Sequence, residues 1–373
     1  MSDVYAARRS RLLERCVTGG SEAALVTGPA NVRYLAGGAP PGSVLLVGPG
    51  HDLLLCTVDP FADHSAGTGP AGRPAEDLRV QLLPSAEGDP AVAAAERAAG
   101  AGVETLAVEE HHLTVARHRA MRSVAPRLHL EDLGPAVEQQ RIVKDGEEIA
   151  ALRIAAEIAD QALGELLESI LVGRTERHLA LELERRLVDH GAGGAAFPTS
   201  VGTGPHSGLA GHVPTDRRVE EGDFLSVCLG ADYRGYHSEI ARTFVIGTSP
   251  AEWQIELYDQ VFAAQRAGRE ALAPGTPYRE VDRAARRVLE AAGHGERVGP
   301  SIGHGVGLEN GEDPRLAPSA MGKLDACVPV TVDPGVHLPG RGGVRIDDTL
   351  VVRPEADGGP ELLTITTKEL LAL

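Results

Sequence analysis

Short apolar runs alternate with a helical pattern in the first third of the chain. The runs predict strands at residues 44–47, 53–56 and 106–108, and an alanine-rich stretch near residues 91–99 predicts a helix. Residues 23–35 have the pattern of a strand, a turn and the start of a helix. Alternation of this kind is typical of an α/β domain with a central sheet.

The pattern changes near residues 134–145, where a linker precedes a new helix. Asp145 suits the N-cap of that helix, because a short polar side chain accepts hydrogen bonds from the first helical turn. Apolar residues then recur at helical spacing at Ile149, Leu152, Ala156, Ala159, Leu163 and Leu167. We therefore expect two domains, one at residues 1–135 and one at residues 136–373.

Further helix starts are predicted in the second domain from capping residues and prolines. They are Thr175, Ser249 with Pro250 and Glu252 in a capping box, and Thr276 with Pro277. The helix that begins at Thr175 is expected to end at Gly191. Helices interleaved with strands in this way favour an α+β arrangement for the second domain.

Composition and charge restrict the function classes. Only 3% of the residues are aromatic, so Leu, Val, Ile and Ala must fill the core. A formal charge of −17 argues against a nucleic-acid partner, which would need a basic face. Four separated cysteines without a C-x-x-C pair indicate a reducing, cytoplasmic setting. No apolar run is long enough to cross a membrane, and the first residues lack the apolar core of a secretion signal.

Ionisable side chains stand at ordered positions of the second domain, at Cys228, Glu239, His304, Asp333 and Asp347. A pair of divalent metal ions needs enough anionic oxygen to offset its charge, and hard cations take that oxygen from carboxylates. A thiolate suits zinc or iron better than manganese or magnesium. These residue types therefore predict one metal ion at most, or none.

The segments around these positions resemble the creatinase, prolidase and aminopeptidase P family. The matching segments are Ala196 to Ser200, Gly204 to Gly208, Gly222-Asp223, Gly235-Tyr236, Arg242 to Phe244, Gly303 to Leu308, Pro334-Gly335 and Gly343 to Ile346. The resemblance covers nearly the whole chain. It implies an α/β N-terminal creatinase-like domain, an α+β pita-bread C-terminal catalytic domain and a homodimer. Metal-dependent members carry Asp, Asp, His, Glu and Glu at the five positions above, so this chain keeps only the histidine.

The resemblance also implies roles for individual residues. Family members carry a histidine at the position of His212, and in the creatinase branch it is the main acid–base group, as suits an imidazole near neutral pH. We expect His212, His304 and Glu239 to be catalytic. Residues expected to bind the substrate are Cys228, His237, Glu312, Asp333, His337, Arg345 and Asp347. A second histidine of the family is replaced by Gly311, which argues against ordinary Xaa-Pro cleavage.

Carboxylates without metal charge repel one another, and a cationic substrate group would relieve that repulsion. The main hypothesis is a metal-independent, creatinase-like enzyme without a cofactor, which acts on a C–N bond of a small, cationic, amino-acid-derived substrate. A second hypothesis is a mononuclear metal-dependent Xaa-Pro peptidase-like hydrolase. It would hold zinc, iron or manganese on Glu239, His304, Asp333 and Asp347. The residues also leave open a non-hydrolytic biosynthetic enzyme and a non-catalytic binding protein on the peptidase scaffold.

Overall fold

The computed structural model describes residues 2–50, 52–58, 73–83, 88–169 and 171–373. The chain forms two compact units, Met1–Arg141 and Ile142–Leu373. The boundary follows α5 (Ala136–Arg141), a short helix that the sequence analysis assigned to the second domain.

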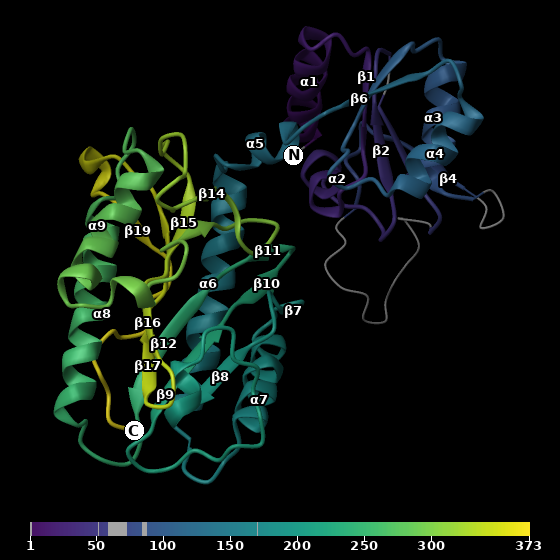
Figure 1. Cartoon of the computed structure of the whole chain (residues 1–373). Helices are drawn as coiled ribbons and strands as arrows, with labels where there is room; N and C mark the ends of the chain where they lie inside the picture. The colour runs from purple at the N-terminus through teal and green to yellow at the C-terminus, as the bar shows by residue number, and fades with distance from the viewer. Residues whose placement is uncertain (1, 51, 59–72, 84–87, 170) are drawn as a thin grey trace. The chain divides into compact units, whose positions relative to one another are not determined.

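A mixed sheet forms the centre of the first unit. Its strands are β1 (Ala23–Val26), β2 (Val44–Val47), β3 (Leu53–Cys56), β4 (Arg79–Leu82), β5 (Thr105–Val108) and β6 (His129–Asp132), in the order β4-β3-β2-β1-β5-β6. Helices α1 (Ser2–Thr18) and α2 (Pro29–Ala36) lie on one face, and α3 (Pro90–Gly100) and α4 (Val115–Val124) lie on the other (Figure 1). The predicted central sheet is confirmed, including the strands expected at residues 44–47 and 53–56.

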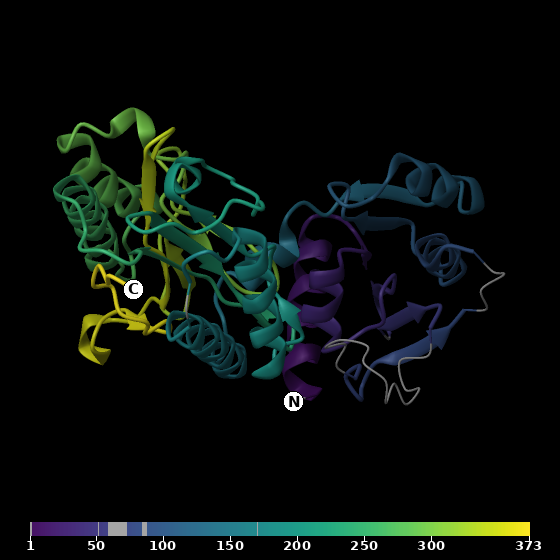
Figure 2. The same cartoon turned by 90° about the horizontal axis from the view of Figure 1, so that it is seen from below.

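Two pairs of helices enclose the strands of the second unit. The helices are α6 (Gly146–Leu167), α7 (Glu176–Asp189), α8 (Glu252–Glu270) and α9 (Tyr278–Ala291). The main strands are β8 (Ser200–Thr203), β9 (Phe224–Leu229), β12 (Ile240–Val245), β13 (His304–Gly305), β14 (Glu312–Arg315), β15 (Pro329–Val332), β16 (Gly335–Leu338), β17 (Gly342–Arg345), β18 (Asp348–Val351) and β19 (Glu361–Leu362). Figures 1 and 2 show α6 and α7 on one side of these strands and α8 and α9 on the other.

The strands of the second unit divide into two main sheets, β12-β9-β8 and β14-β13-β15-β18-β19. The hairpin of β16 and β17 and the small sheet β11 (Tyr236–His237), β10 (Ala231–Tyr233) and β7 (Gly194–Ala195) complete the unit. Apolar side chains of β9 and β12 join a core with α6 and α7, whereas those of β15, β17 and β18 join a core with α8 and α9. These two cores define two halves of the unit, one under α6 and α7 and one under α8 and α9. Because side chains alternate along a strand, the strand faces that point away from these cores are left for polar residues.

Local capping explains most helix starts. Asp145 forms a capping box with Glu148 at the start of α6, and the Thr175 hydroxyl caps α7, as predicted. The expected start at Ser249 and Pro250 is wrong, because α8 begins at Glu252, where the Gln254 side chain accepts a hydrogen bond from the Ala251 N–H. The start predicted at Thr276 is also displaced, since α9 begins at Tyr278. None of the helices in the described part of the chain combines the length and apolar character needed to cross a membrane.

Candidate metal centre

The β9 and β12 strands carry the first two residues of the centre, Cys228 and Glu239. Leu225, Val227 and Leu229 face the core under α6 and α7, so strand alternation places Cys228 on the other face. Glu239 immediately precedes β12, and its Oε1 lies 3.8 Å from the Cys228 Sγ. Both side chains are buried. Burial raises the pKa of the Cys228 thiol well above its ordinary value, and the charge of Arg345 offsets only part of that effect.

The other half of the unit supplies Asp333, Arg345 and Asp347 in the same way. Val332, Val344 and Ile346 lie in the core under α8 and α9. Asp333 follows β15, Arg345 ends β17, and Asp347 lies between β17 and β18. The backbone of Asp347 forms a bridge with Ala241 of β12, which joins the two halves next to the polar cluster.

His304, at the start of β13, faces the same carboxylates. Its Nδ1 lies 3.0 Å from the Gly305 carbonyl oxygen, which can only accept a hydrogen bond, so Nδ1 is a donor and Nε2 is turned toward the cluster. Nε2 lies 3.2 Å from Glu239 Oε2 and 3.9 Å from Asp333 Oδ2. Burial opposes a charge on the imidazole, but the two carboxylates outweigh it and raise the pKa of His304 to about 9.

Arg345 is the cation that reaches all three acids. Its Nη2 lies 2.8 Å from Glu239 Oε1, 3.5 Å from Asp333 Oδ2 and 2.7 Å from Asp347 Oδ2. Even so, burial raises the pKa of Asp347 well above its usual value and also raises the pKa of Asp333. Burial is outweighed at Glu239, where His304 and Arg345 lower the pKa, but it is not compensated at Asp333 and Asp347.

Several carboxylate oxygens of the centre receive no hydrogen bond from the described residues. They are Asp333 Oδ1 and both side-chain oxygens of Asp347, whereas Glu239 Oε2 faces the His304 Nε2 at 3.2 Å. Asp347 Oδ2 instead forms an ion pair with Arg345 Nη2, at 2.7 Å. Buried polar atoms without partners cost free energy, so this cluster has the charge and the free acceptors for a further cation.

The donor atoms of the centre fall into two overlapping groups. Cys228, Glu239 and Asp347 bring one potential ligand atom each within 4.8 Å of one another, and so do Glu239, His304 and Asp333. Glu239 belongs to both groups, and a carboxylate can bridge two ions through its two oxygens. The free oxygens and the orientation of His304 fit divalent metal ions, and these five residues would hold them.

Besides Arg345, three of the residues expected to bind the substrate lie outside both donor groups. Glu312, on β14, forms a buried ion pair with Lys144. His337, on β16, places Nδ1 3.4 Å from the Ser207 carbonyl oxygen, and burial lowers the pKa of His337. His237, on β11, donates its backbone N–H to the Gly307 carbonyl oxygen. Their expected roles remain predictions.

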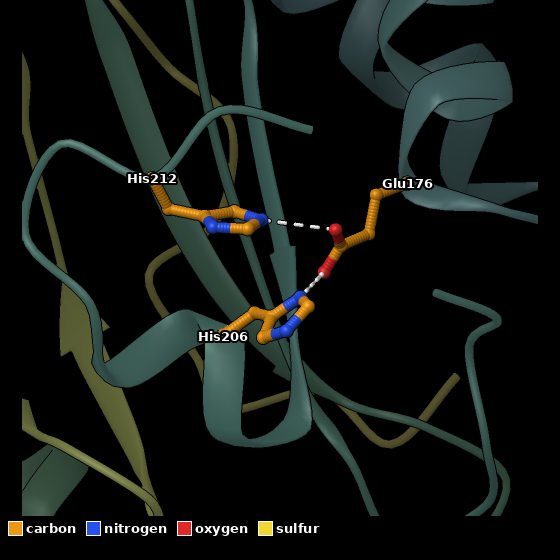
Figure 3. A group of neighbouring side chains, drawn as sticks. All are labelled: Glu176, His206 and His212. Atoms are coloured by element: carbon orange, nitrogen blue, oxygen red, sulfur yellow. Dashed lines mark hydrogen bonds and ion pairs between the residues drawn. The ribbon is translucent and has the colours of Figure 1, made fainter. Parts of the chain in front are cut away.

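His212 also lies outside these two donor groups and is held by Glu176, at the start of α7 (Figure 3). The His212 Nε2 lies 2.9 Å from Glu176 Oε2, and the His206 Nδ1 lies 2.9 Å from Oε1 of the same carboxylate. The backbone N–H groups of Thr203 and Thr215 donate to the two oxygens as well, at 2.9 Å each. Burial favours the neutral acid, but these donors outweigh it and lower the pKa of Glu176.

Sequence reasoning missed Glu176 and His206 as partners of His212. An acidic residue directly after the Thr175 N-cap is explained by the helix dipole alone, so it gave no signal of a tertiary role. Only the fold brings Glu176 next to the segment that contains His206 and His212.

Comparisons with known proteins support a metal centre at this place. Residues 150–354 match the model of metallopeptidase family M24, and residues 8–143 match that of the creatinase/prolidase N-terminal domain. An Xaa-Pro dipeptidase of Pyrococcus horikoshii is 31% identical over 99% of this chain and 100% of its own length. An Xaa-Pro dipeptidase of Pyrococcus furiosus is 40% identical over 63% of this chain and 66% of its own length. The solved structure of an Xaa-Pro dipeptidase from Bacillus anthracis superposes with a TM-score of 0.90 at 31% identity, covering 99% of this chain and all of the other.

These matches confirm the expected fold, a creatinase-like N-terminal domain followed by a pita-bread domain. They overturn the main functional hypothesis. A metal-independent creatinase-like enzyme without a cofactor is wrong, because the matching catalytic domain is that of a metallopeptidase family and the full-length relative is an Xaa-Pro dipeptidase. The error came from giving the exchange of ligand types more weight than the matching scaffold. The second hypothesis, a mononuclear metal-dependent Xaa-Pro peptidase-like hydrolase, agrees better with the relatives than the main one does.

Proposed function

Because the chain belongs to metallopeptidase family M24, whose members are hydrolases, we propose that it is a metal-dependent Xaa-Pro dipeptidase. Such an enzyme hydrolyses the bond between a first residue and a following proline. The observation that carries the proposal is the pair of donor groups that share Glu239, with buried carboxylate oxygens left without hydrogen bonds from the described residues. The activity named for the similar proteins supports the choice of substrate.

The residues of the centre have separate tasks in this proposal. Cys228, Glu239, His304, Asp333 and Asp347 would hold the metal, which would supply the Lewis acidity needed to polarise a peptide carbonyl. Arg345 offsets part of the negative charge of the acids and holds them in place. The Gly305 carbonyl fixes the ring of His304, so that its Nε2 stays directed at the centre.

His212 is our candidate for delivering a proton to the leaving proline nitrogen. The segment Gly204–Gly208, which carries His206, packs on the hairpin of β16 and β17, where Gly343 donates its N–H to the Ser207 hydroxyl at 3.0 Å. That hairpin begins after Asp333 and ends at Arg345. The segment Gly204–Gly208 therefore lies beside a hairpin that is flanked by two residues of the centre. The hydrogen bond to Glu176 sets the orientation of the His212 imidazole.

A test uses the purified full-length chain, stripped with a chelator and reloaded separately with zinc, cobalt or manganese. We expect proline release from Leu-Pro only after reloading, and much slower cleavage of Leu-Gly. The variant His304→Ala should not be reactivated, whereas His129→Ala, which removes an exposed imidazole of β6, should behave like the wild type. A folded, metal-loaded chain that releases no proline from any Xaa-Pro dipeptide would overturn the proposal.

A further inference from the structure

Cys228 is surrounded by charged groups although it lies on a mostly apolar strand. Its neighbours Val227 and Leu229 pack in the core under α6 and α7, but its own sulfur contacts the Glu239 carboxylate at 3.8 Å. The charges of Arg345, Glu239, Asp347 and Asp333 all act on the thiol. A buried cysteine that only fills space would be expected among apolar side chains.

An independent observation at the same place points to a ligand. Asp347, which completes the donor group with Cys228 and Glu239, is fully buried; its Oδ2 forms an ion pair with Arg345, at 2.7 Å, but neither of its side-chain oxygens receives a hydrogen bond from the described residues. Sulfur and two carboxylate oxygens thus converge within 4.8 Å of one another. This group contains a soft donor, whereas the group of Glu239, His304 and Asp333 contains only nitrogen and oxygen donors.

The difference in donors has a direct chemical consequence. Thiolate ligands favour zinc and other ions late in the first transition row, whereas manganese and magnesium favour oxygen. In a cluster built only of carboxylates and one imidazole, neither position would discriminate strongly by ligand softness. One sulfur atom makes the two positions of this centre unlike each other.

We propose that Cys228 is a metal ligand, and that the position bounded by Cys228, Glu239 and Asp347 selects zinc, cobalt or ferrous ions over manganese and magnesium. The inference rests on the proposed metal dependence and adds the identity of the ion. On binding, the thiol gives its proton to solvent and its sulfur forms a bond to the ion, with no change of oxidation state. The position of Glu239, His304 and Asp333 remains open to harder ions.

Cobalt(II) is the probe for the test, because a bond between cobalt and a thiolate gives an intense charge-transfer absorption in the near ultraviolet. The chelated, reduced full-length chain is titrated with cobalt, and bound cobalt is counted by equilibrium dialysis. Cys228→Asp and Cys228→Ser remove the thiolate. Cys327→Ser is the matched control, because it removes a cysteine that accepts a hydrogen bond from Arg353, and a hydroxyl retains that acceptor.

We expect the absorption in the wild type and in Cys327→Ser, and its loss in both Cys228 variants. In Cys228→Asp the ratio of zinc to manganese affinity should fall by about tenfold or more, since a soft ligand is exchanged for a hard one. Cobalt that binds the wild type without the thiolate absorption would overturn this inference and leave the metal-dependent function intact. A wild-type chain that binds no cobalt, zinc or manganese would overturn both.

Discussion

Asp347 and Asp348 are adjacent in the chain, yet their carboxylates have opposite environments. Asp348 is fully buried and accepts hydrogen bonds from Arg242 and Lys368, at 2.7 Å each. Asp347 is equally buried, but its side-chain oxygens receive no hydrogen bond from the described residues. One acid is satisfied by the fold, and the other is left for a ligand.

The two neighbours should therefore respond differently to the same change. Asp348→Asn breaks a buried ion pair and should lower the free energy of unfolding by about 3 kcal/mol or more, with or without metal. Asp347→Asn removes a carboxylate that shares Arg345 with Glu239 and Asp333 and whose pKa is raised by burial, so it should cost the chelated protein much less than Asp348→Asn. Urea unfolding of both variants in chelator measures these changes.

Zinc adds a second measurement to this comparison. Zinc at one hundred times its dissociation constant should stabilise the wild type by roughly 2.7 kcal/mol. We expect Asp348→Asn to keep that increment and Asp347→Asn to lose most of it. Equal increments for the two variants would show that Asp347 does not hold the ion.

Arg345 should matter most when no metal is bound. In the chelated protein it is the guanidinium that pairs with Glu239 and Asp347, so Arg345→Met leaves buried carboxylates unpaired and should cost about 3 kcal/mol. A bound divalent ion replaces the missing charge, so saturating zinc should restore most of the loss. Urea unfolding with and without zinc measures both values.

The matched control for that experiment is Arg153→Met. Arg153 forms a half-exposed pair with Glu361, and such pairs contribute about 1 kcal/mol at most. Zinc should not change the effect of this substitution. If zinc fails to rescue Arg345→Met, the guanidinium supports the fold and not the charge balance of the centre.

The sequence was most informative where the structure depends on local chemistry. Asp145 and Thr175 were recognised as helix caps because a cap needs only its own side chain and the next turn. The start of α8 was mistaken because Ser249 and Pro250 have the right types, but Gln254 supplies the contact that fixes the first turn. Competing caps within a few residues differ by too little free energy to be ranked without the fold.

Within the centre, the ordered positions of Cys228, Glu239, His304, Asp333 and Asp347 were identified from the sequence, and the fold brings them together. Metal dependence was misjudged, because ligand strength was argued from residue types alone. Glu239 belongs to two donor groups, and this sharing depends on the three-dimensional positions of the side chains. The spacing of the residues along the sequence cannot predict it. The lack of hydrogen bonds to the side-chain oxygens of Asp347 from the described residues is likewise visible only once neighbouring side chains are placed.

Glu176 should make stability depend on acidity. Its hydrogen-bond donors outweigh burial and hold its pKa below the usual 4.5, so its contribution is present above pH 4.5 and is lost as the pH falls below that value. Glu176→Gln should be less stable at neutral pH by about 1 to 3 kcal/mol and should show a flatter decline in acid. Urea unfolding across the acidic range tests this. Glu157→Gln, an exposed change on α6, should follow the wild-type curve; an unchanged slope in Glu176→Gln would contradict the assignment.

His212 and His206 contact the same carboxylate, so substituting each separately can distinguish a catalytic proton carrier from a structural network. If His212 carries the proton to the leaving nitrogen, His212→Ala should lower kcat for Leu-Pro by about a hundredfold and remove one limb of the pH–rate profile. His206→Ala removes the equivalent contact to Oε1 and should lower kcat far less. Zinc affinity should be unchanged in both, because neither imidazole belongs to the two donor groups of the centre. Equal losses of kcat with an unaltered pH–rate profile would instead mean that both histidines only brace Glu176 and the start of α7.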